Sequence, residues 1–243
     1  MLDVPISIKD KENSKNMTEC DGSIEFRDVT FGYVSEQPIL QNISFKVNPG
    51  ETVALVGPTG SGKTSITALV HRFYDAWKGE VLIGGDNVRD ITQESLGEHV
   101  SMVLQEPFLF TGSILDNIKY KCHAATLKKV LDAARAVGAD EFIRELPDGY
   151  DTILEQRGAN LSLGQRQLIS FARAILADAK ILVLDEATAS VDSYTEMQIQ
   201  MALKKLLEGR TGLVIAHRLA TIRGCDRIIA VSYTHLTLPT NRE

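Results

Sequence analysis

The stretch TVALVGPTGSGKT, residues 52–64, decides the fold. Its first five residues form an apolar run of strand length, and a segment with helical apolar spacing, residues 63–74, follows the glycine-rich loop. The loop fits the pattern G-x-x-x-x-G-K-[ST], in which glycines let backbone N–H groups curl around a phosphate group. Lys63 then brings a positive charge to the β- and γ-phosphate oxygens, and the hydroxyl of Thr64 can ligate Mg²⁺. With a strand before it and a helix after it, the loop predicts a nucleotide-binding site.

A second apolar run, ILVLD at residues 181–185, ends in a pair of carboxylates, Asp185 and Glu186. The carboxyl ends of parallel strands meet at one edge of a sheet, so these carboxylates are expected beside the phosphate loop. There Asp185 can hold Mg²⁺, directly or through water, and Glu186 is placed to polarise an attacking water molecule. Two acidic residues after a hydrophobic strand are more often a solvated strand end, but the upstream phosphate loop favours the functional interpretation.

Strand-like and helical segments alternate along the rest of the chain. Strands are expected at residues 23–33, 39–47, 51–57, 79–85, 98–105, 211–217 and 226–231. Helical apolar spacing extends over residues 113–146 and 191–209. The later strands are unbroken apolar runs, which is typical of a parallel sheet covered by helices on both faces.

Composition bounds the class of protein. At 243 residues the chain has room for one large α/β domain or two small ones, and its 44% hydrophobic and 24% charged residues exclude wholesale disorder. The net charge of −6 argues against a general nucleic-acid binder, so we expect no nucleic-acid partner. Cys20, Cys122 and Cys225 lie far apart and predict unpaired thiols in a reducing compartment. No apolar run approaches the ~20 residues of a membrane span.

A second candidate anion site lies in ANLSLGQRQLISFARAIL, residues 159–176. Its small and polar residues, Ser162 to Gln165, lead directly into a run with helical apolar spacing. Such a helix start offers free backbone N–H groups and the positive end of the helix dipole to an anion. A chain of modest length therefore carries two phosphate-binding helix ends.

Three further residues have both a structural and a functional interpretation. His217 ends an expected strand, where histidines are usually structural. Gln105 also ends a strand and would pass as an ordinary polar loop residue. Tyr33, ahead of the phosphate loop, can be a core residue, a surface residue or a platform on which a purine stacks.

Together these residues resemble the nucleotide-binding domain of ABC transporters. Tyr33 matches the adenine-stacking aromatic of the family's A-loop, and GPTGSGKT matches its Walker A motif. Gln105, in LQEPFLF, matches the Q-loop, and LSLGQ at residues 161–165 matches the family signature. ILVLDE matches Walker B, ASVD at residues 189–192 resembles the D-loop, and His217 matches the switch histidine. The motifs follow one another in the family order, which makes the resemblance specific.

The resemblance implies a fold and a division of the chain. The fold is an α/β P-loop NTPase with a RecA-like parallel core, an N-terminal antiparallel β portion and a helical subdomain at about residues 105–164. The nucleotide-binding domain is expected at residues 23–231. Residues 1–22 are expected to be a linker from a membrane domain, because MLDVP resembles the family's connector and Met1 can be internal to a longer half-transporter. Residues 232–243 resemble a translated sequencing adapter and are expected to be a non-native tail without function; a divergent natural terminus is the alternative.

The resemblance also implies the residues of the site. The ATP-binding residues are Tyr33, Gly57, Thr59, Gly60, Ser61, Gly62, Lys63, Thr64 and Ser65. The Mg²⁺ ligands are Thr64, Gln105 and Asp185. The catalytic residues are Glu186, Lys63 and His217, the last two stabilising the charge of the γ-phosphate. The residues that face a partner chain are Ser162, Gly164 and Gln165 of the signature and Asp192 of the D-loop.

The implied function is ATP binding and hydrolysis that powers transport. Family members form head-to-tail dimers in which each ATP lies between the Walker A motif of one subunit and the signature of the other, which accounts for two phosphate-binding helix ends. The expected partners are a second nucleotide-binding domain and a transmembrane domain, at the cytoplasmic face of the cell membrane as part of a membrane protein complex. An importer subunit and a soluble ABC ATPase are alternatives, and an intact Glu186 disfavours a regulatory module that does not turn over.

Several details resemble the exporter branch, and two depart from it. FLFTGSILDNI and TILEQRGANLS are similar to exporter segments. Gln156 stands where exporters commonly carry Glu, and Leu163 stands where the family signature has glycine. A side chain at that position crowds a loop whose backbone approaches phosphate closely. We therefore expect an asymmetric heterodimer, with a homodimer that tolerates Leu163 as the alternative.

Overall fold

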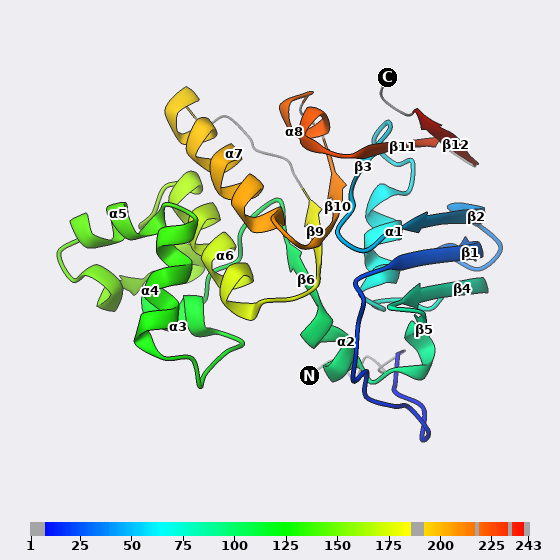
Figure 1. Cartoon of the computed structure of the whole chain (residues 1–243), viewed down its shortest axis with the longest axis horizontal. Helices are drawn as coiled ribbons and strands as arrows, with labels where there is room; N and C mark the ends of the chain where they lie inside the picture. The colour runs from blue at the N-terminus through cyan, green and yellow to red at the C-terminus, as the bar shows by residue number, and fades with distance from the viewer. Residues whose placement is uncertain (1–7, 186–191, 217–218, 233–234, 241–243) are drawn as a thin grey trace.

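The computed structural model describes residues 8–185, 192–216, 219–232 and 235–240. Within these ranges the chain forms a mainly parallel sheet, an antiparallel sheet, a small two-stranded sheet and a group of helices (Figure 1). The α/β P-loop NTPase fold, with its antiparallel β portion and helical subdomain, is confirmed. None of the helices in these ranges combines the length and apolar character that crossing a bilayer requires.

The mainly parallel sheet positions the site. Its strand order is β12-β11-β3-β10-β9-β6. The strands are β3 (Thr52–Val56), β6 (Val100–Val103), β9 (Ile181–Asp185), β10 (Thr211–Ile215), β11 (Arg227–Ser232) and β12 (His235–Thr240). Neighbouring strands pair in parallel, except that β12 is antiparallel to β11. The loops that follow the parallel strands therefore gather at one edge of the sheet.

Alternate residues of these strands face two separate cores. Val53 and Leu55 of β3 lie in one core, and Ala54 between them lies in the other. The first core includes residues of α1 (Lys63–Val70) and the antiparallel sheet. The second includes residues of α6 (Leu163–Ala177) and α7 (Ser193–Leu207). Burial on both faces is the reason that the strand sequences are unbroken apolar runs.

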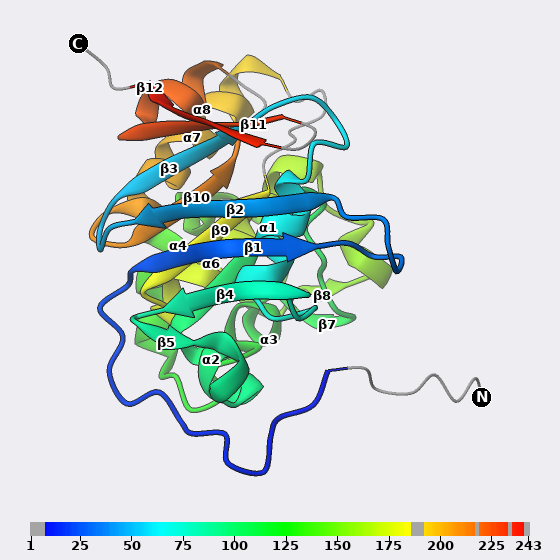
Figure 2. The same cartoon turned by 90° about the vertical axis from the view of Figure 1, so that its right-hand side faces the viewer.

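The antiparallel sheet covers the helix that follows the phosphate loop. Its strand order is β2-β1-β4-β5, with β1 (Ile24–Phe31), β2 (Leu40–Val47), β4 (Lys78–Ile83) and β5 (Asp86–Asn87). Phe26 pairs with Phe45 across β1 and β2, and their rings stack with centroids 4.6 Å apart. In Figure 2 this sheet lies in front of α1, so the helix is enclosed between two sheets.

The helical subdomain lies beside the parallel sheet, on the side of α6 (Figure 1). It contains α3 (Ile114–Lys119), α4 (Leu127–Ala136), α5 (Ala139–Glu145) and the small sheet of β7 (Gly112–Ser113) and β8 (Ile153–Leu154). The single helical region predicted at residues 113–146 is thus divided. Thr126 caps the start of α4 by accepting from the N–H of Lys129, and Gly138 begins α5 in the left-handed region.

Shorter elements complete the connections. Helix α2 (Gln93–His99) leads into β6, and α8 (Leu219–Gly224) precedes β11. Single 3₁₀ turns lie at Val88–Asp90, Gly149–Asp151 and Gln156–Gly158.

Both ends of the described chain pack more closely than the sequence indicates. Met17, in the segment expected to be a linker, is only 5% exposed and belongs to the first core. Residues 235–240, in the segment expected to be a tail, form β12 and pair with β11. An extended segment needs no hydrophobic period to pair with a sheet edge, because the pairing uses backbone groups.

Candidate functional site

The phosphate loop runs from the end of β3 to the start of α1. Gly62 caps α1 with a left-handed φ of 99°, and a Cβ added there would lie 2.6 Å from Cδ2 of Leu40 in β2. Both the conformation and the close approach require glycine at this position. The ammonium of Lys63 folds back over the loop and donates to the carbonyl oxygens of Gly57 and Pro58, at 2.8 Å each.

The surroundings of the loop favour an anion. Lys63 is only 6% exposed, and this burial lowers the pKa of its ammonium, while the carboxylate of Asp185 acts in the opposite direction. Ser61 is also buried, and its hydroxyl oxygen has no hydrogen-bond partner among the described residues. A buried cation and an unsatisfied hydroxyl at the start of a helix are the features expected of a phosphate cradle.

One cavity of about 480 Å³ brings most of the predicted nucleotide residues together. Its walls are formed by Tyr33, Ile39, Thr59, Gly60, Gly62, Lys63, Thr64, Ser65, Gln105, Asp185 and Ile215. They come from the loop between β1 and β2, the phosphate loop, the first turn of α1 and the ends of β6, β9 and β10. Gly57 and Ser61 lie in the same loop but outside this lining.

The cavity is lined by oxygen atoms that can serve as ligands of Mg²⁺. Thr64 offers a hydroxyl, Gln105 a side-chain amide oxygen and Asp185 a carboxylate, and all three line the same space. Mg²⁺ prefers such hard oxygen ligands and usually keeps waters or substrate phosphates as its remaining ligands. Within the described ranges no group of three or more His, Cys, Asp or Glu side chains is placed to hold a metal ion.

The ring of Tyr33 is held in place at the wall of the cavity. Its hydroxyl lies 3.1 Å from the hydroxyl oxygen of Ser65, two residues into α1. The rings of Phe31 and Tyr74 contact it edge-on, each with a centroid distance of 5.0 Å. Tyr33 is still 48% exposed, so an aromatic surface remains available for stacking.

The two catalytic candidates that complete the predicted site, Glu186 and His217, lie outside the described residues. The strands that precede them are in register, since Asp185 pairs with Ile215.

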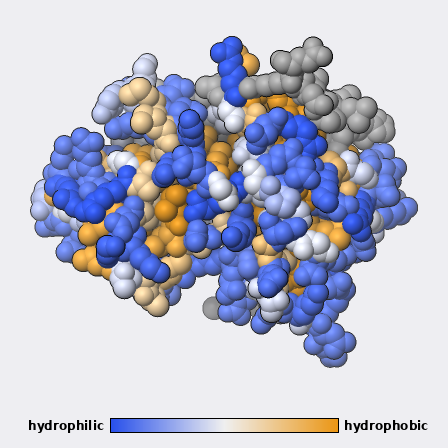
Figure 3. Space-filling view, in the orientation of Figure 1, coloured by the Kyte–Doolittle hydropathy of each residue, from blue (hydrophilic) through white to orange (hydrophobic). Residues whose placement is uncertain are grey.

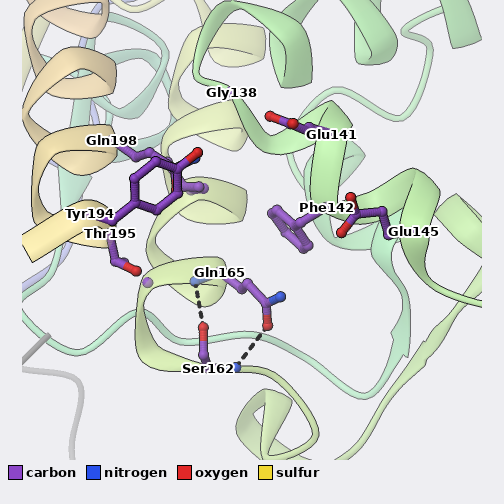
Figure 4. Close-up of a pocket in the computed structure, with 11 residues that line it drawn as sticks. Gly138, Glu141, Phe142, Glu145, Ser162, Gln165, Tyr194, Thr195 and Gln198 are labelled. Atoms are coloured by element: carbon purple, nitrogen blue, oxygen red, sulfur yellow. Dashed lines mark hydrogen bonds between the residues drawn. The ribbon is translucent and has the colours of Figure 1, made fainter. Parts of the chain in front are cut away.

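The second helix start, at α6, is organised differently. The hydroxyl of Ser162 accepts from the backbone N–H of Gln165 at 3.2 Å, and the Gln165 side chain accepts from the Ser162 N–H at 3.0 Å (Figure 4). This reciprocal pair is a capping box. A Cβ on Gly164 would lie 2.2 Å from Cγ2 of Thr195, so α6 and α7 touch at a glycine.

A cavity of about 340 Å³ adjoins this helix start, between α5, α6 and α7. Ser162, Gly164 and Gln165 line it together with Tyr194 and Thr195, and Figure 4 shows Glu141 and Phe142 of α5 on the opposite wall. The cavity shares no lining residue with the nucleotide cavity. Leu163, the first residue of α6, is partly buried, and Gln156 lies exposed in a 3₁₀ turn.

Asp192 caps the start of α7. Its carboxylate accepts from the N–H groups of Tyr194 and Thr195 at 3.1 and 3.0 Å, and from the Thr195 hydroxyl at 2.6 Å. The hydrogen bonds from Thr195 hold the pKa of this carboxyl below its usual value. The other residues of the predicted D-loop, 189–191, lie outside the described ranges.

Sequence reasoning missed the apolar walls and an aromatic surface. Ile39 and Ile215 line the nucleotide cavity, but an apolar residue at a strand end gives no signal that separates it from the core. Phe108, Phe110 and Tyr120 are 46%, 38% and 48% exposed near α3. Figure 3 shows that apolar side chains are also exposed over the helical subdomain. The stretch FLFTGSILDNI gave a hint of this surface, because its two phenylalanines do not lie in an unbroken apolar run of the kind that forms a buried strand.

Arg173 of α6 organises this aromatic surface. Its guanidinium lies over the rings of Phe110 and Tyr120, 5.8 and 5.3 Å from their centroids. It also donates to the carbonyl oxygen of Phe108 at 3.0 Å and to that of Asn117 at 2.8 Å. Burial lowers the pKa of Arg173. Exposed aromatic side chains fixed in this way form a candidate interaction surface.

Comparisons with known proteins agree on the class of this chain. Residues 40–189 match the family model described as ABC transporter. An uncharacterized ABC transporter ATP-binding protein of Bacillus subtilis (strain 168), YknV, is 50% identical over 232 residues, which are 96% of this chain and 38% of that protein. The ATP-dependent lipid A-core flippase of Desulfotalea psychrophila (strain LSv54 / DSM 12343) is 47% identical over 231 residues, 95% of this chain and 40% of the flippase.

The solved structures extend the comparison to three dimensions. The structure of a bacterial Atm1-family ABC exporter with ATP bound superposes with a TM-score of 0.91 at 37% sequence identity. The match covers 98% of this chain and 42% of the exporter chain. This chain therefore spans about two fifths of the length of the relatives it matches.

Proposed function

The chain belongs to the ABC transporter family, and we propose that it is the ATP-binding and ATP-hydrolysing domain of an exporter. The observation that carries the proposal is the single cavity that contains the Lys63 ammonium, three oxygen donors for Mg²⁺ and the ring of Tyr33. A triphosphate, its metal ion and a purine need these groups, in this combination.

The residues have distinct roles in the proposed reaction. Tyr33 stacks on the adenine, and the N–H groups of the loop 57–62 hold the β-phosphate. Lys63 exchanges its bonds to the Gly57 and Pro58 carbonyls for bonds to phosphate oxygens, so a cation already dehydrated by the fold meets the developing charge. Mg²⁺, held by Thr64, Gln105 and Asp185, would neutralise phosphate charge when bound.

Glu186 and His217 complete the proposed chemistry. By resemblance to the family, Glu186 accepts a proton from the attacking water, and His217 donates a hydrogen bond to the γ-phosphate. The products are ADP and inorganic phosphate.

A second nucleotide-binding domain completes each site in this proposal. The start of α6, with Ser162 and Gly164 at its cavity, faces the γ-phosphate of an ATP on the partner. In the isolated chain the Ser162 hydroxyl oxygen accepts a hydrogen bond from the Gln165 N–H. The hydroxyl can keep this bond and still donate its own proton to a phosphate oxygen of the partner's ATP. Leu163 at the first position of α6 supports an asymmetric heterodimer, in which this signature is the weaker one.

The transmembrane partner docks on the aromatic surface of Phe108, Phe110 and Tyr120. The adjoining hollow of about 440 Å³ is lined by these last two aromatic residues and by polar side chains of α3, which suits a short amphipathic segment. Gln105 lies three residues before Phe108, so the same loop reaches both the metal site and the docking surface. In this proposal the domain lies at the cytoplasmic face of a membrane complex.

The test is Mg·ATP binding and phosphate release by the chain and by Glu186→Gln. We expect the wild type to bind and hydrolyse Mg·ATP, and Glu186→Gln to bind it but release almost no phosphate. A wild-type chain that binds no Mg·ATP, or a Glu186→Gln variant with undiminished turnover, would contradict the proposal.

A further inference from the structure

An N-terminal segment, residues 9–17, lies along the domain next to α2 (Figure 2). We call it the strap. The N–H of Lys15 donates to the carbonyl oxygen of Asp90 at 2.9 Å, and the N–H of Thr92 donates back to Lys15 at 3.0 Å. The N–H of Met17 donates to the hydroxyl of Ser95 at 2.8 Å. These bonds make the strap part of the folded domain.

A buried arginine joins the strap to the helix of the phosphate loop. Arg72 follows the last turn of α1, and its N–H donates to the carbonyl oxygen of Leu69. Its side chain is 1% exposed, and its φ of 51° is unusual for a residue other than glycine. The guanidinium donates to the carbonyl oxygens of Lys9 and Ile91 at 3.0 and 2.9 Å and to the Asp10 carboxylate at 3.1 Å.

The same carboxylate holds the start of a second element. Both oxygens of Asp10 accept from the backbone N–H of Gln93, the first residue of α2, at 3.1 and 3.2 Å. Helix α2 leads directly into β6, which ends two residues before Gln105. Asp10 therefore bonds to Arg72, which follows α1, and to the first residue of α2. Helix α1 contains Thr64, and α2 and β6 lead to Gln105, so both connections reach the metal side of the nucleotide cavity.

We propose that Asp10, through Arg72, couples the position of the strap to occupancy of the nucleotide site. The inference rests on the proposed function, because it takes Mg·ATP as the ligand that draws Thr64 and Gln105 together. Every residue of α1 except Thr64 is buried, so the helix moves as a rigid body between Lys63 and Arg72. Asp10 is a positioning residue in this scheme and touches no nucleotide.

Coupling of this kind is reciprocal. If bound nucleotide favours the docked strap, then docking of the strap favours nucleotide binding by the same factor. A change in the docking of the strap would then change the affinity of the ATP site, although the strap does not contact that site.

The experiment is backbone amide exchange on the full chain, with Mg²⁺ alone and with Mg²⁺ and a non-hydrolysable ATP analogue. Calorimetry on the same samples gives the Kd of the analogue. We expect the Lys15 and Met17 amides to exchange more slowly when the analogue is bound, by at least about fivefold, the lower end of usual coupling factors. In Asp10→Ala this protection is lost, and the Kd rises by a similar factor.

Lys11→Ala is the matched control on the strap. Lys11 makes an exposed ion pair with Asp90 at 2.6 Å, and its other hydrogen bonds among the described residues are with Ser14 of the strap itself. Exposed pairs contribute little, so both the protection and the Kd are expected to match the wild type. If Asp10→Ala fails to fold, Asp10→Asn keeps an acceptor oxygen and is expected to lose part of the protection.

The outcomes separate this inference from the proposed function. Analogue binding without slower exchange in the wild-type strap overturns the inference and leaves the function in place. Equal loss of protection in Lys11→Ala and Asp10→Ala also overturns it, because loosening of the strap would then be unspecific. A wild type that binds no analogue overturns the proposed function itself.

Discussion

The starts of α1 and α6 are both polar, glycine-containing helix ends, yet their donors are used differently. At α1, Lys63 bonds only to carbonyl oxygens of its own loop, and the Ser61 hydroxyl lacks a hydrogen-bond partner among the described residues. At α6, the Ser162 hydroxyl and the Gln165 side chain form a closed capping box. The first helix start therefore offers polar groups to a ligand, whereas the side chains at the second one already form the hydrogen bonds of a helix cap. The sequence predicts an anion site at both helix starts. The structure distinguishes them by which polar groups have a hydrogen-bond partner.

Lys63→Ala should have the largest effect and acts only on the first site. Loss of one charge-stabilising donor is expected to slow ATP hydrolysis by about a hundredfold to a thousandfold. The thermal midpoint should not fall, because the variant removes a buried charge whose pKa the fold already lowers. Phosphate release at saturating Mg·ATP measures the effect. Lys128→Ala, whose side chain is 88% exposed, is the control, and an equal loss in the control would contradict the assignment.

The C-terminal ends of the two helices also differ, because His71 follows the last residue of α1 and Asp178 follows the last residue of α6. Burial, with a smaller effect of Lys121, lowers the pKa of His71 from 6.5 to about 4. Its Nε2 is buried without a hydrogen-bond partner among the described residues. The fold holds the neutral ring, so between these two values the unfolded chain binds more protons, and stability falls as pH falls.

The expected loss for His71 is about 2 kcal/mol between about pH 7 and about pH 5, above the range in which ordinary carboxyls titrate. Urea unfolding at the two pH values measures it. His71→Phe keeps the stacking on Phe73 and should remove this part of the pH dependence. An unchanged slope in the variant would show that other groups cause the loss.

Gly164→Ala tests how tightly the second helix start is packed. The added methyl group meets Cγ2 of Thr195 at 2.2 Å, so the free energy of unfolding should fall by about 1 to 3 kcal/mol. Thr195→Ser removes that methyl group and keeps the hydroxyl bonded to Asp192. In the double variant most of the stability should return, as a urea double-mutant cycle would show. Additive losses would mean that the two residues do not compete for space.

Ser162→Ala should have the smallest effect on the isolated chain. Loss of the cap is expected to lower the free energy of unfolding by about 1 kcal/mol, and Ser162→Thr should retain most of it. The Kd of Mg·ATP should not change, because the two cavities share no lining residue. Calorimetry and urea unfolding give the two quantities. A weaker Kd in Ser162→Ala would show that the two sites communicate within one chain.

The parallel core and the grouping of Lys63, Thr64, Gln105 and Asp185 around one cavity could be predicted from the sequence, because both follow from local patterns. Unbroken apolar runs identified β3, β9 and β10, and the spacing of GPTGSGKT placed Lys63 and Thr64 at a helix start. The meeting of Gln105 and Asp185 with this loop follows from the rule for the carboxyl ends of parallel strands.

Other features depended on tertiary contacts that no local pattern encodes. The edge-on contacts that fix Tyr33 come from Phe31 and Tyr74, which are distant from each other in the sequence. Arg72 looks like an ordinary surface arginine in the sequence, and its burial is explained by its acceptors on Lys9, Asp10, Asp75 and Ile91. The division of residues 113–146 depended on caps such as Gly138, which helical spacing does not reveal.

Strand β12 has a consequence for solubility. Because it pairs with β11, the backbone of β11 is shielded on a side where the sheet would otherwise end in unpaired N–H and C=O groups. An open edge of that kind can template pairing between molecules and start aggregation. Pro239 gives β12 one position without an N–H donor, which makes it a poorer template than β11. A chain cut after Val231 should therefore remain folded but self-associate, whatever the origin of residues 232–243.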